Sequence, residues 1–148
     1  MCGIAGIVHL KGKPVSSDAL KRMSDAISHR GPDAEGQWTE DNVGLGHRRL
    51  SIIDLSSAGR QPMFSGDNRY VLTYNGEVYN YLDLRTELKA LGYGFSSNTD
   101  SEVVLYSLVE WGVDALLRFN GMFAFAFYDR KEKQLLLARD RYGIKPLY

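Results

Sequence analysis

The chain has 148 residues, enough for one compact domain with a sizeable apolar core but too few for a second domain. Lysine plus arginine and aspartate plus glutamate each number 18, so no net charge favours binding to nucleic acid or to an anionic membrane. The longest apolar run, Met122 to Tyr128, is far too short to span a membrane, and no basic segment followed by a long apolar one stands at the N-terminus. We therefore expect a cytoplasmic protein that binds neither nucleic acid nor membrane.

Residues 3–10 are typical of a short buried strand, which ends at the turn-forming segment 11–14 and places Cys2 at a strand end. Ser16 or Ser17 can cap a helix that stops before the polar loop 29–33, because apolar residues recur at helical spacing between them. Further strands are expected at three short segments, residues 37–39, 43–47 and 50–53.

Asn75-Gly76 stands between the strand-like runs 69–74 and 77–79, and Asn-Gly in that setting predicts a hairpin turn. Amphipathic helices are expected over residues 82–91, ending at Gly92, and over residues 100–111, beginning at Asp100. Residues 121–128 and 134–139 alternate as a second hairpin. Strands outnumber helices and the helices fall between strand groups, which predicts an α+β domain with helices covering stacked, largely antiparallel sheets.

The only cysteine, Cys2, cannot form an internal disulfide, and His9, His29 and His47 lack the spacing of metal ligands. Gly44-Leu45-Gly46-His47 lacks the third glycine of a dinucleotide fingerprint, and a phosphate-binding P-loop is absent. We expect no metal and no cofactor in this domain.

Removal of Met1 would leave Cys2 with both a thiol and a free α-amine. The reference pKa of an α-amine is roughly 7.7 to 8.0, so the amine can take the thiol proton and later return it to a leaving amine without a catalytic histidine. Taken alone, a cysteine at this position is most simply an incidental or packing thiol.

Three polar segments have two interpretations each. Arg48 and Arg49 can be a solvated basic end or part of a site; Asn75-Gly76 suits a turn whatever its function; and residues 98–102 can be merely a helix cap. The loop 29–33 can support a site or can simply be a Gly-Pro turn.

Taken together, these segments resemble the glutaminase domain of glutamine-dependent asparagine synthetase, a class II amidotransferase with an N-terminal cysteine. The resemblance spans residues 2–148 and is carried by Cys2-Gly3-Ile4-Ala5-Gly6, His29-Arg30-Gly31-Pro32-Asp33, Arg49-Leu50-Ser51-Ile52-Ile53-Asp54, Tyr74-Asn75-Gly76-Glu77-Val78-Tyr79-Asn80, Thr99-Asp100-Ser101-Glu102, Gly121-Met122-Phe123-Ala124-Phe125-Ala126 and residues 139–148. It implies the four-layered αββα sandwich of the N-terminal nucleophile hydrolases.

The resemblance also implies the catalytic roles. Cys2 corresponds to the nucleophile that attacks the side-chain amide of glutamine, releases ammonia and leaves a γ-glutamyl thioester for water to hydrolyse. Asn75, through its side-chain amide, and Gly76, through its backbone N–H, correspond to the oxyanion hole. Fixed donors aimed at the developing charge are what such a step requires.

The same resemblance implies the groups that bind the substrate. Arg49, rather than Arg48, corresponds to the arginine that holds the α-carboxylate, a task suited to a planar, always-charged guanidinium. Asp100 and the backbone around Glu77 correspond to the groups that hold the α-ammonium. The backbone of four further residues is expected to line the pocket: Leu50, Ser51, Ile52 and Ile53.

The chain lacks the Ser-Gly-Gly-x-Asp-Ser loop of the ATP-dependent synthetase domain, so ATP and Mg are expected only in such a domain, elsewhere in the full-length chain or in a partner. The family's glutaminase domains continue for a few strands beyond the point matching Tyr148, which leads us to expect an N-terminal fragment or an unusually short version. L-glutamine is the expected substrate, with aspartate as the default acceptor of the ammonia, and a homodimer is possible.

Two rival interpretations stay open. One is a catalytically silent module of the same fold that binds glutamine or docks on a synthetase, which a retained Met1 would favour because its amide blocks the α-amine. The other is an N-terminal nucleophile acylase of other amides, although Arg49 and Asp100 suit a free amino acid better.

Overall fold

Two antiparallel sheets form the centre of the molecule in the computed structural model, which describes residues 2–52 and 54–148. The first has the strand order β1-β3-β2 and the second the order β4-β5-β6-β7. Their bounds are β1 Gly3–Val8, β2 Ala34–Glu40, β3 Val43–Arg49, β4 Met63–Phe64, β5 Tyr70–Val78, β6 Gly121–Asp129 and β7 Gln134–Arg139.

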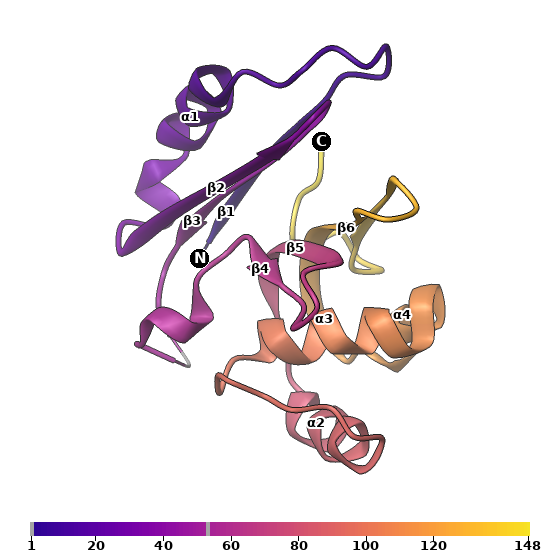
Figure 1. Ribbon diagram of the computed structural model, residues 1–148. Coiled ribbons are helices and arrows are strands. Elements are labelled where there is room, and N and C mark those ends of the chain that lie inside the picture. Colours follow the sequence, from indigo (N-terminus) through magenta and orange to yellow (C-terminus); the bar gives the residue numbers. More distant parts are fainter. Residues whose placement is uncertain (1, 53) are drawn as a thin grey trace.

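Helices cover the outer faces of both sheets (Figure 1). On one side α1 packs on β1 and β3, and on the other α3 packs on β5 with α2 beside it. The α-helices are α1 Ser17–Ala26, α2 Tyr81–Ala90, α3 Asp100–Trp111 and α4 Ala115–Arg118, with single 3-10 turns at Ser28–Arg30, Ser57–Gly59 and Gly112–Asp114. The four-layered αββα arrangement expected from the sequence is confirmed.

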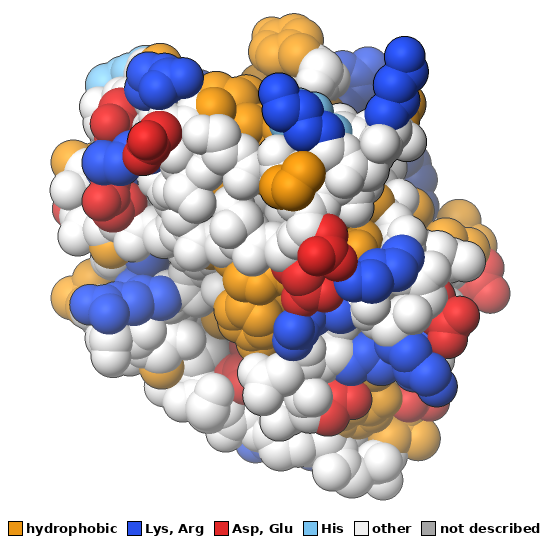
Figure 2. Space-filling model, turned by 45° about the horizontal axis from the view of Figure 1, so that its top comes forward, with side chains coloured by type: hydrophobic (Ala, Val, Ile, Leu, Met, Phe, Trp, Pro, Cys, Tyr) orange, Lys and Arg blue, Asp and Glu red, His pale blue; other side chains and the backbone are white. Residues whose placement is uncertain are grey.

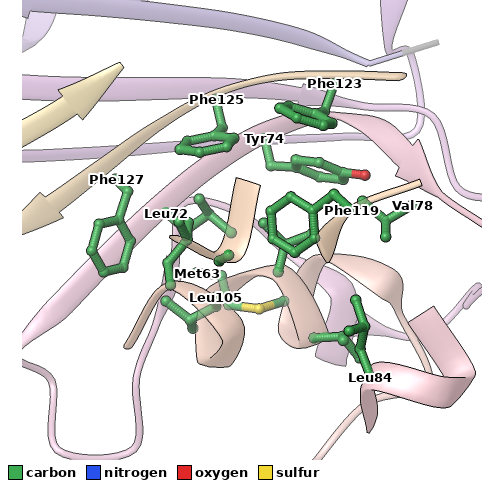
Figure 3. Packing of buried hydrophobic residues seen from close by; sticks show 14 of the residues in the cluster. Met63, Leu72, Tyr74, Val78, Leu84, Leu105, Phe119, Phe123, Phe125 and Phe127 are labelled. Atoms are coloured by element: carbon green, nitrogen blue, oxygen red, sulfur yellow. The ribbon is translucent and has the colours of Figure 1, made fainter. Parts of the chain in front are cut away.

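The larger apolar core lies between the second sheet and its helices (Figure 3). Phe123, Phe125 and Phe127 alternate along β6 and point to this side, and the rings of Phe123 and Phe125 stack with centroids 5.9 Å apart. From α3, Val103, Val104 and Leu105 are fully buried against them. Since each such aliphatic side chain contributes about 1.5 to 3 kcal/mol on burial, this layer fixes α3 against β5.

A smaller cluster holds the two sheets together. It contains Val43, Leu45, Val71, Ala126 and Tyr128. The odd-numbered residues of β5 therefore face the first sheet, while its even-numbered residues face the helices. This alternation decides which side chains of β5 reach the space between the sheets.

One sequence prediction is wrong at Asn75-Gly76. These residues do not form a hairpin turn, because β5 runs through them and pairs Asn75 with Ala124 and Gly76 with Phe123. Nine consecutive residue pairs with β6 stabilise the extended strand more than the local preference of Asn-Gly stabilises a turn. The hairpin expected around residues 129–132 is confirmed, joining β6 to β7.

The strand expected at residues 50–53 is also wrong for its described part. β3 ends at Arg49, whose partner Ala34 is the first residue of β2, and Arg48 pairs with Gly3 at the start of β1. Beyond these pairs the described residues offer no strand beside residues 50–52, so the chain leaves the sheet there. Ile53 lies outside the described residues.

The other elements predicted from the sequence differ only at their ends, whereas β4 and α4 were not predicted. The first strand stops at Val8, the strand expected at 37–39 extends over Ala34–Glu40, and the helix beginning at Asp100 ends at Trp111 as expected.

Acidic and basic side chains are mixed over the face in Figure 2, without one large patch of a single sign. Within residues 2–52 and 54–148, no helix has both the length and the apolar character to cross a membrane.

Candidate functional site

A pocket opens where the two sheets meet, beside the start of β1 and the end of β3. It contains most of the residues singled out from the sequence: Cys2, Arg49, Leu50, Ile52, Asn75, Gly76, Glu77 and Asp100. Ser51 instead lines a neighbouring groove with Asp33 and Ser56. Ile53 is outside the described part of the chain.

Cys2 is half-buried at the pocket and is held from two sides. Its Sγ accepts a hydrogen bond from the Leu50 N–H at 3.4 Å and lies 3.7 Å from the carbonyl oxygen of the same residue. Arg30 Nε donates to the carbonyl oxygen of Cys2 at 3.1 Å. The thiol therefore has a defined position at the pocket wall.

The loop 29–33 supports the pocket, whereas its sequence leaves open whether it supports a site or is simply a turn. Besides the contact of Arg30 with Cys2, the Asp33 N–H donates to the carbonyl oxygen of Arg49 at 3.0 Å. The Asp33 carboxylate accepts from the Ser51 N–H at 2.8 Å. The loop thus fixes both the cysteine and the segment that follows β3.

The edge of β5 nearest the pocket presents backbone groups at alternate residues. The Tyr74 N–H donates to Gln61 Oε1 at 2.6 Å, and the Val78 N–H donates to Asp100 Oδ2 at 3.0 Å. Both groups point away from β6, and Gly76 lies between them at the same strand parity. The Gly76 N–H therefore points to the same edge, where the pocket lies.

The side chain of Asn75 reaches the space between the sheets because it follows the parity of Thr73. Thr73 Oγ1 donates to the carbonyl oxygen of Gly46 on β3 at 3.2 Å, which shows that this face of β5 is turned toward the first sheet. Asn75 is buried and lines the pocket. Gly76 needs to be glycine for packing, since a Cβ there would overlap the backbone of Met122 and Phe123 on β6.

The two arginines at the end of β3 point to opposite faces. Arg49 is buried beside the pocket, where Nη1 donates to the carbonyl oxygen of Ser56 at 2.7 Å and Nη2 donates to that of Asp54. Arg48 faces α1, forming ion pairs with Asp25 and with Glu35. Arg48 therefore lies outside the pocket, although its ion pairs make it less solvated than the basic-end interpretation expects, whereas Arg49 belongs to the pocket.

The pKa values of two carboxyl groups near the pocket are shifted in opposite directions. Burial raises the pKa of Asp100, although the Tyr74 hydroxyl and the Val78 N–H stabilise its charged form. Hydrogen bonds from Ser56 and from the Asn98 N–H lower the pKa of Asp54 to about 2. Asp54 organises the loop around Arg49, and Asp100 is the buried acid in the pocket.

Asp100 also begins α3. Thr99 is the N-cap of this helix, and its side chain accepts from the Glu102 N–H at 3.3 Å, so the helix-cap interpretation of this segment is correct as well. A guanidinium at one wall and a carboxylate at another complement the two charges of a free amino acid. A thiol and backbone donors nearby suit nucleophilic attack on a carbonyl carbon.

Several lining residues escaped the sequence reasoning. They are Asp54, Gly59, Gln61, Tyr74, Thr99, Ser101, Met122 and Lys145. A turn at Asn75-Gly76 predicts no face for Tyr74, whereas the continuous β5 places it on the helix side. No local pattern in the sequence marks Gln61. Among the described residues, no group of three His, Cys, Asp or Glu side chains is arranged to hold a metal ion.

Comparison with known proteins places this pocket in context. A family model described as a glutamine amidotransferase domain matches residues 1–148. The chain is 46% identical over 152 residues to asparagine synthetase [glutamine-hydrolyzing] 3 of Bacillus subtilis (strain 168), covering 100% of this chain and 24% of that protein. It is 41% identical over 160 residues to amidase chry2 of Gibberella zeae, again covering 100% of this chain and 24% of the relative.

A third relative matches over a similar length. The putative asparagine synthetase [glutamine-hydrolyzing] 2 of Methanocaldococcus jannaschii is 39% identical over 166 residues, covering 100% of this chain and 32% of the relative. The chain thus spans only about a quarter to a third of the length of these proteins.

Among solved structures, a glutamine phosphoribosylpyrophosphate amidotransferase of B. subtilis complexed with ADP and GMP has a similar fold. The TM-score is 0.80 at 18% identity, over 97% of this chain and 38% of that one. At this identity the likeness concerns the fold alone.

Proposed function

We propose that this chain, which belongs to the glutamine amidotransferase domain family, hydrolyses L-glutamine to glutamate and ammonia in the pocket beside Cys2. The observation that carries the proposal is the meeting of Cys2, Asn75, Gly76, Arg49 and Asp100 in one pocket. These residues come from four separate segments of the chain, and their chemical types match the parts of a glutamine substrate.

The substrate's charged end is bound first. Arg49, anchored by the carbonyl groups of Ser56 and Asp54, binds the α-carboxylate. Asp100 and the backbone at Glu77 bind the α-ammonium. This arrangement leaves the side-chain amide of glutamine directed toward the thiol of Cys2, which lines the same pocket.

The chemistry proceeds through a γ-glutamyl thioester. After removal of Met1, the α-amine of Cys2 takes the thiol proton, and sulfur attacks the amide carbon. The negative charge passes to the amide oxygen, which accepts hydrogen bonds from the Asn75 side chain and the Gly76 N–H. When the carbon–nitrogen bond breaks, the proton goes from the α-ammonium of Cys2 to the leaving nitrogen, and ammonia departs.

Hydrolysis of the thioester restores the enzyme. Water adds to the thioester carbonyl while the α-amine accepts its proton, and the same donors bind the second oxyanion. Carbon–sulfur cleavage then releases glutamate and returns the proton to the thiol. Because the proposed base is a free α-amine, removal of Met1 is a requirement of this proposal.

We further infer that the ammonia serves an ATP-dependent amidation. The relatives named asparagine synthetases are three to four times longer than the region matched here, which supports a synthetase domain in the same longer chain or in a partner. Aspartate is the proposed acceptor, and ATP and Mg are expected to bind to that domain alone.

The decisive experiment incubates the purified protein with L-glutamine and measures glutamate and ammonia, beside the variant Cys2→Ala. We expect equimolar glutamate and ammonia from the unsubstituted protein and none from the variant. Binding of glutamine without turnover would support the silent binding module instead. Equal turnover by both proteins would exclude Cys2 as nucleophile.

A further inference from the structure

The two backbone polar groups of Tyr74 are hydrogen-bonded to side chains in place of a neighbouring strand. β4 pairs with β5 only at Leu72 and Val71, so the pocket edge of β5 has no strand beside it at Tyr74 in the described part of the chain. There, Gln61 Oε1 accepts from the Tyr74 N–H at 2.6 Å. His47 Nε2 lies 3.1 Å from the Tyr74 carbonyl oxygen, and only a protonated Nε2 can donate to it.

Both side chains are themselves tightly fixed. His47 and Gln61 are 1% and 7% exposed. Gly36 on β2 pairs directly with His47 across the strands, and a Cβ at Gly36 would overlap the carbonyl oxygen of Gln61. Gln61 Nε2 also donates to Ser101 Oγ at 3.3 Å. The pair is therefore held by β2 and β3 of the first sheet and by α3.

The bonded carbonyl belongs to the peptide that joins Tyr74 to Asn75. Its orientation sets the direction in which β5 presents the Asn75 side chain on one face and the Gly76 N–H at the edge. Within residues 2–52 and 54–148, no hydrogen-bond partner reaches Nδ1 of His47, so the ring makes this one hydrogen bond. Burial lowers the pKa of His47 to about 4, which keeps the ring neutral at physiological pH.

We propose that His47 and Gln61 are positioning residues that hold the Tyr74 backbone so that Asn75 and Gly76 are aimed at the oxyanion of the reaction. The inference rests on the proposed glutamine hydrolysis. His47 does not line the pocket, and Gln61, which does, acts in this role through the Tyr74 backbone. They take the place of a neighbouring strand at Tyr74, on the edge of β5 that faces the pocket.

The test compares kcat and KM for glutamine in His47→Leu, Gln61→Met and His47→Gln. Leucine cannot donate to the Tyr74 carbonyl, and methionine leaves the Tyr74 N–H without a good acceptor. Because small displacements of such donors cost up to about a hundredfold in rate, we expect kcat to fall by about ten- to a hundredfold, with KM changed less than about threefold. His47→Gln, which retains a donor near the position of Nε2, should recover most of the lost kcat.

Thr73→Val is the matched control. Thr73 also forms a buried hydrogen bond between β5 and β3, but its side chain donates to the Gly46 carbonyl oxygen and not to a backbone group of β5. Its loss should lower the melting temperature about as much as His47→Leu while kcat and KM stay within about twofold. Alkylation of the only cysteine by iodoacetamide should proceed at the same rate in all variants, since Leu50 and Arg30 hold Cys2.

The outcomes separate the two proposals. If the unsubstituted protein releases no glutamate, the proposed function fails and this inference fails with it. If it is active but the folded variants behave like Thr73→Val, or lose activity through KM alone, the positioning role is wrong. Should His47→Leu not fold, Gln61→Met and the recovery in His47→Gln decide the question.

Discussion

The phenolic hydroxyl of Tyr74 donates a 2.7 Å hydrogen bond to Oδ2 of Asp100, linking β5 to the first residue of α3 inside the pocket wall. Tyr74 is 2% exposed, and burial raises its pKa well above the usual value, so the hydroxyl remains a donor. In Figure 3 its ring lies among the buried aromatic residues with the hydroxyl at its outer end. One residue thus connects the backbone edge beside Cys2 with the acid proposed to bind the α-ammonium.

Tyr74→Phe removes this hydroxyl while keeping the ring. The hydrogen bond favours the charged form of Asp100, so its loss should raise the pKa of Asp100 further. We expect the KM for glutamine to rise by about three- to tenfold, roughly one hydrogen bond's contribution, with kcat nearly constant. The rise of KM on acidification should also begin at a higher pH in the variant. Identical KM–pH profiles would contradict the link.

Arg49→Lys should raise the glutamine KM strongly, because it replaces a planar pair of donors by a point charge and loses the carbonyl contacts of Ser56 and Asp54. Arg48→Lys is the matched control. It weakens the ion pairs with Asp25 and Glu35 on the α1 side and should change KM less than about twofold. Equal KM changes at both positions would refute the assignment of Arg49.

Asn75→Ala should lower kcat by about a hundred- to a thousandfold with little change in KM, since its amide acts on the oxyanion and only weakly on bound substrate. Steady-state glutamate release checks this. Thr73→Val, two residues earlier on the same face of β5, provides the control. A pure KM effect of Asn75→Ala would count against the oxyanion role.

The buried His47 predicts a pH dependence of stability. Its pKa is about 4 in the folded protein and 6.5 ordinarily, mainly because burial disfavours the charged ring. Between these values the unfolded chain binds more protons, so stability should fall as the pH falls from 6.5 toward 4, by on the order of 3 kcal/mol. Urea unfolding at pH 7 and pH 4.5 measures this loss. His47→Gln cannot titrate and should lose less stability over the same interval; parallel losses would refute the assignment to His47.

The proposed base requires a free α-amine on Cys2. Purified from a bacterium with working methionine aminopeptidase, the protein should be lighter by one methionine residue in intact mass, and turnover should scale with the processed fraction. A preparation that retains Met1 throughout should be inactive, because an acylated nitrogen is not basic. Full turnover by that preparation would exclude the α-amine and direct attention to the histidines.

The sequence could predict the elements whose signals are local. Thr99 and Asp100 mark the start of α3, and a helix end at Trp111 follows from the glycine after it, whose φ of 55° suits glycine. The hairpin of β6 and β7 is likewise defined by alternation and by a polar turn. Such features depend on residues that are close together in the sequence, so the folded protein keeps them.

Asn75-Gly76 shows where local reasoning fails. The pair has the strongest hairpin preference in the chain, yet it lies inside β5 because β6, about fifty residues later, pairs along its full length. Pairing with a distant strand contributes more than the preference of two residues. The resemblance nevertheless pointed to these residues as oxyanion donors, a role that suits the strand edge as well as a turn.

The resemblance singles out Arg49 from Arg48, but composition and spacing cannot, because the difference between the two residues arises in the tertiary structure. Adjacent residues of a strand face opposite sides, and composition cannot tell which side holds the pocket and which holds α1. The sequence by itself determined the kinds of group present, a thiol, an arginine, an acid and amide donors. Only the stacking of the two sheets brought them together. The backbone edge at Gly76 is open because, among the described residues, no strand pairs with β5 there, and both features depend on contacts between segments far apart in the chain.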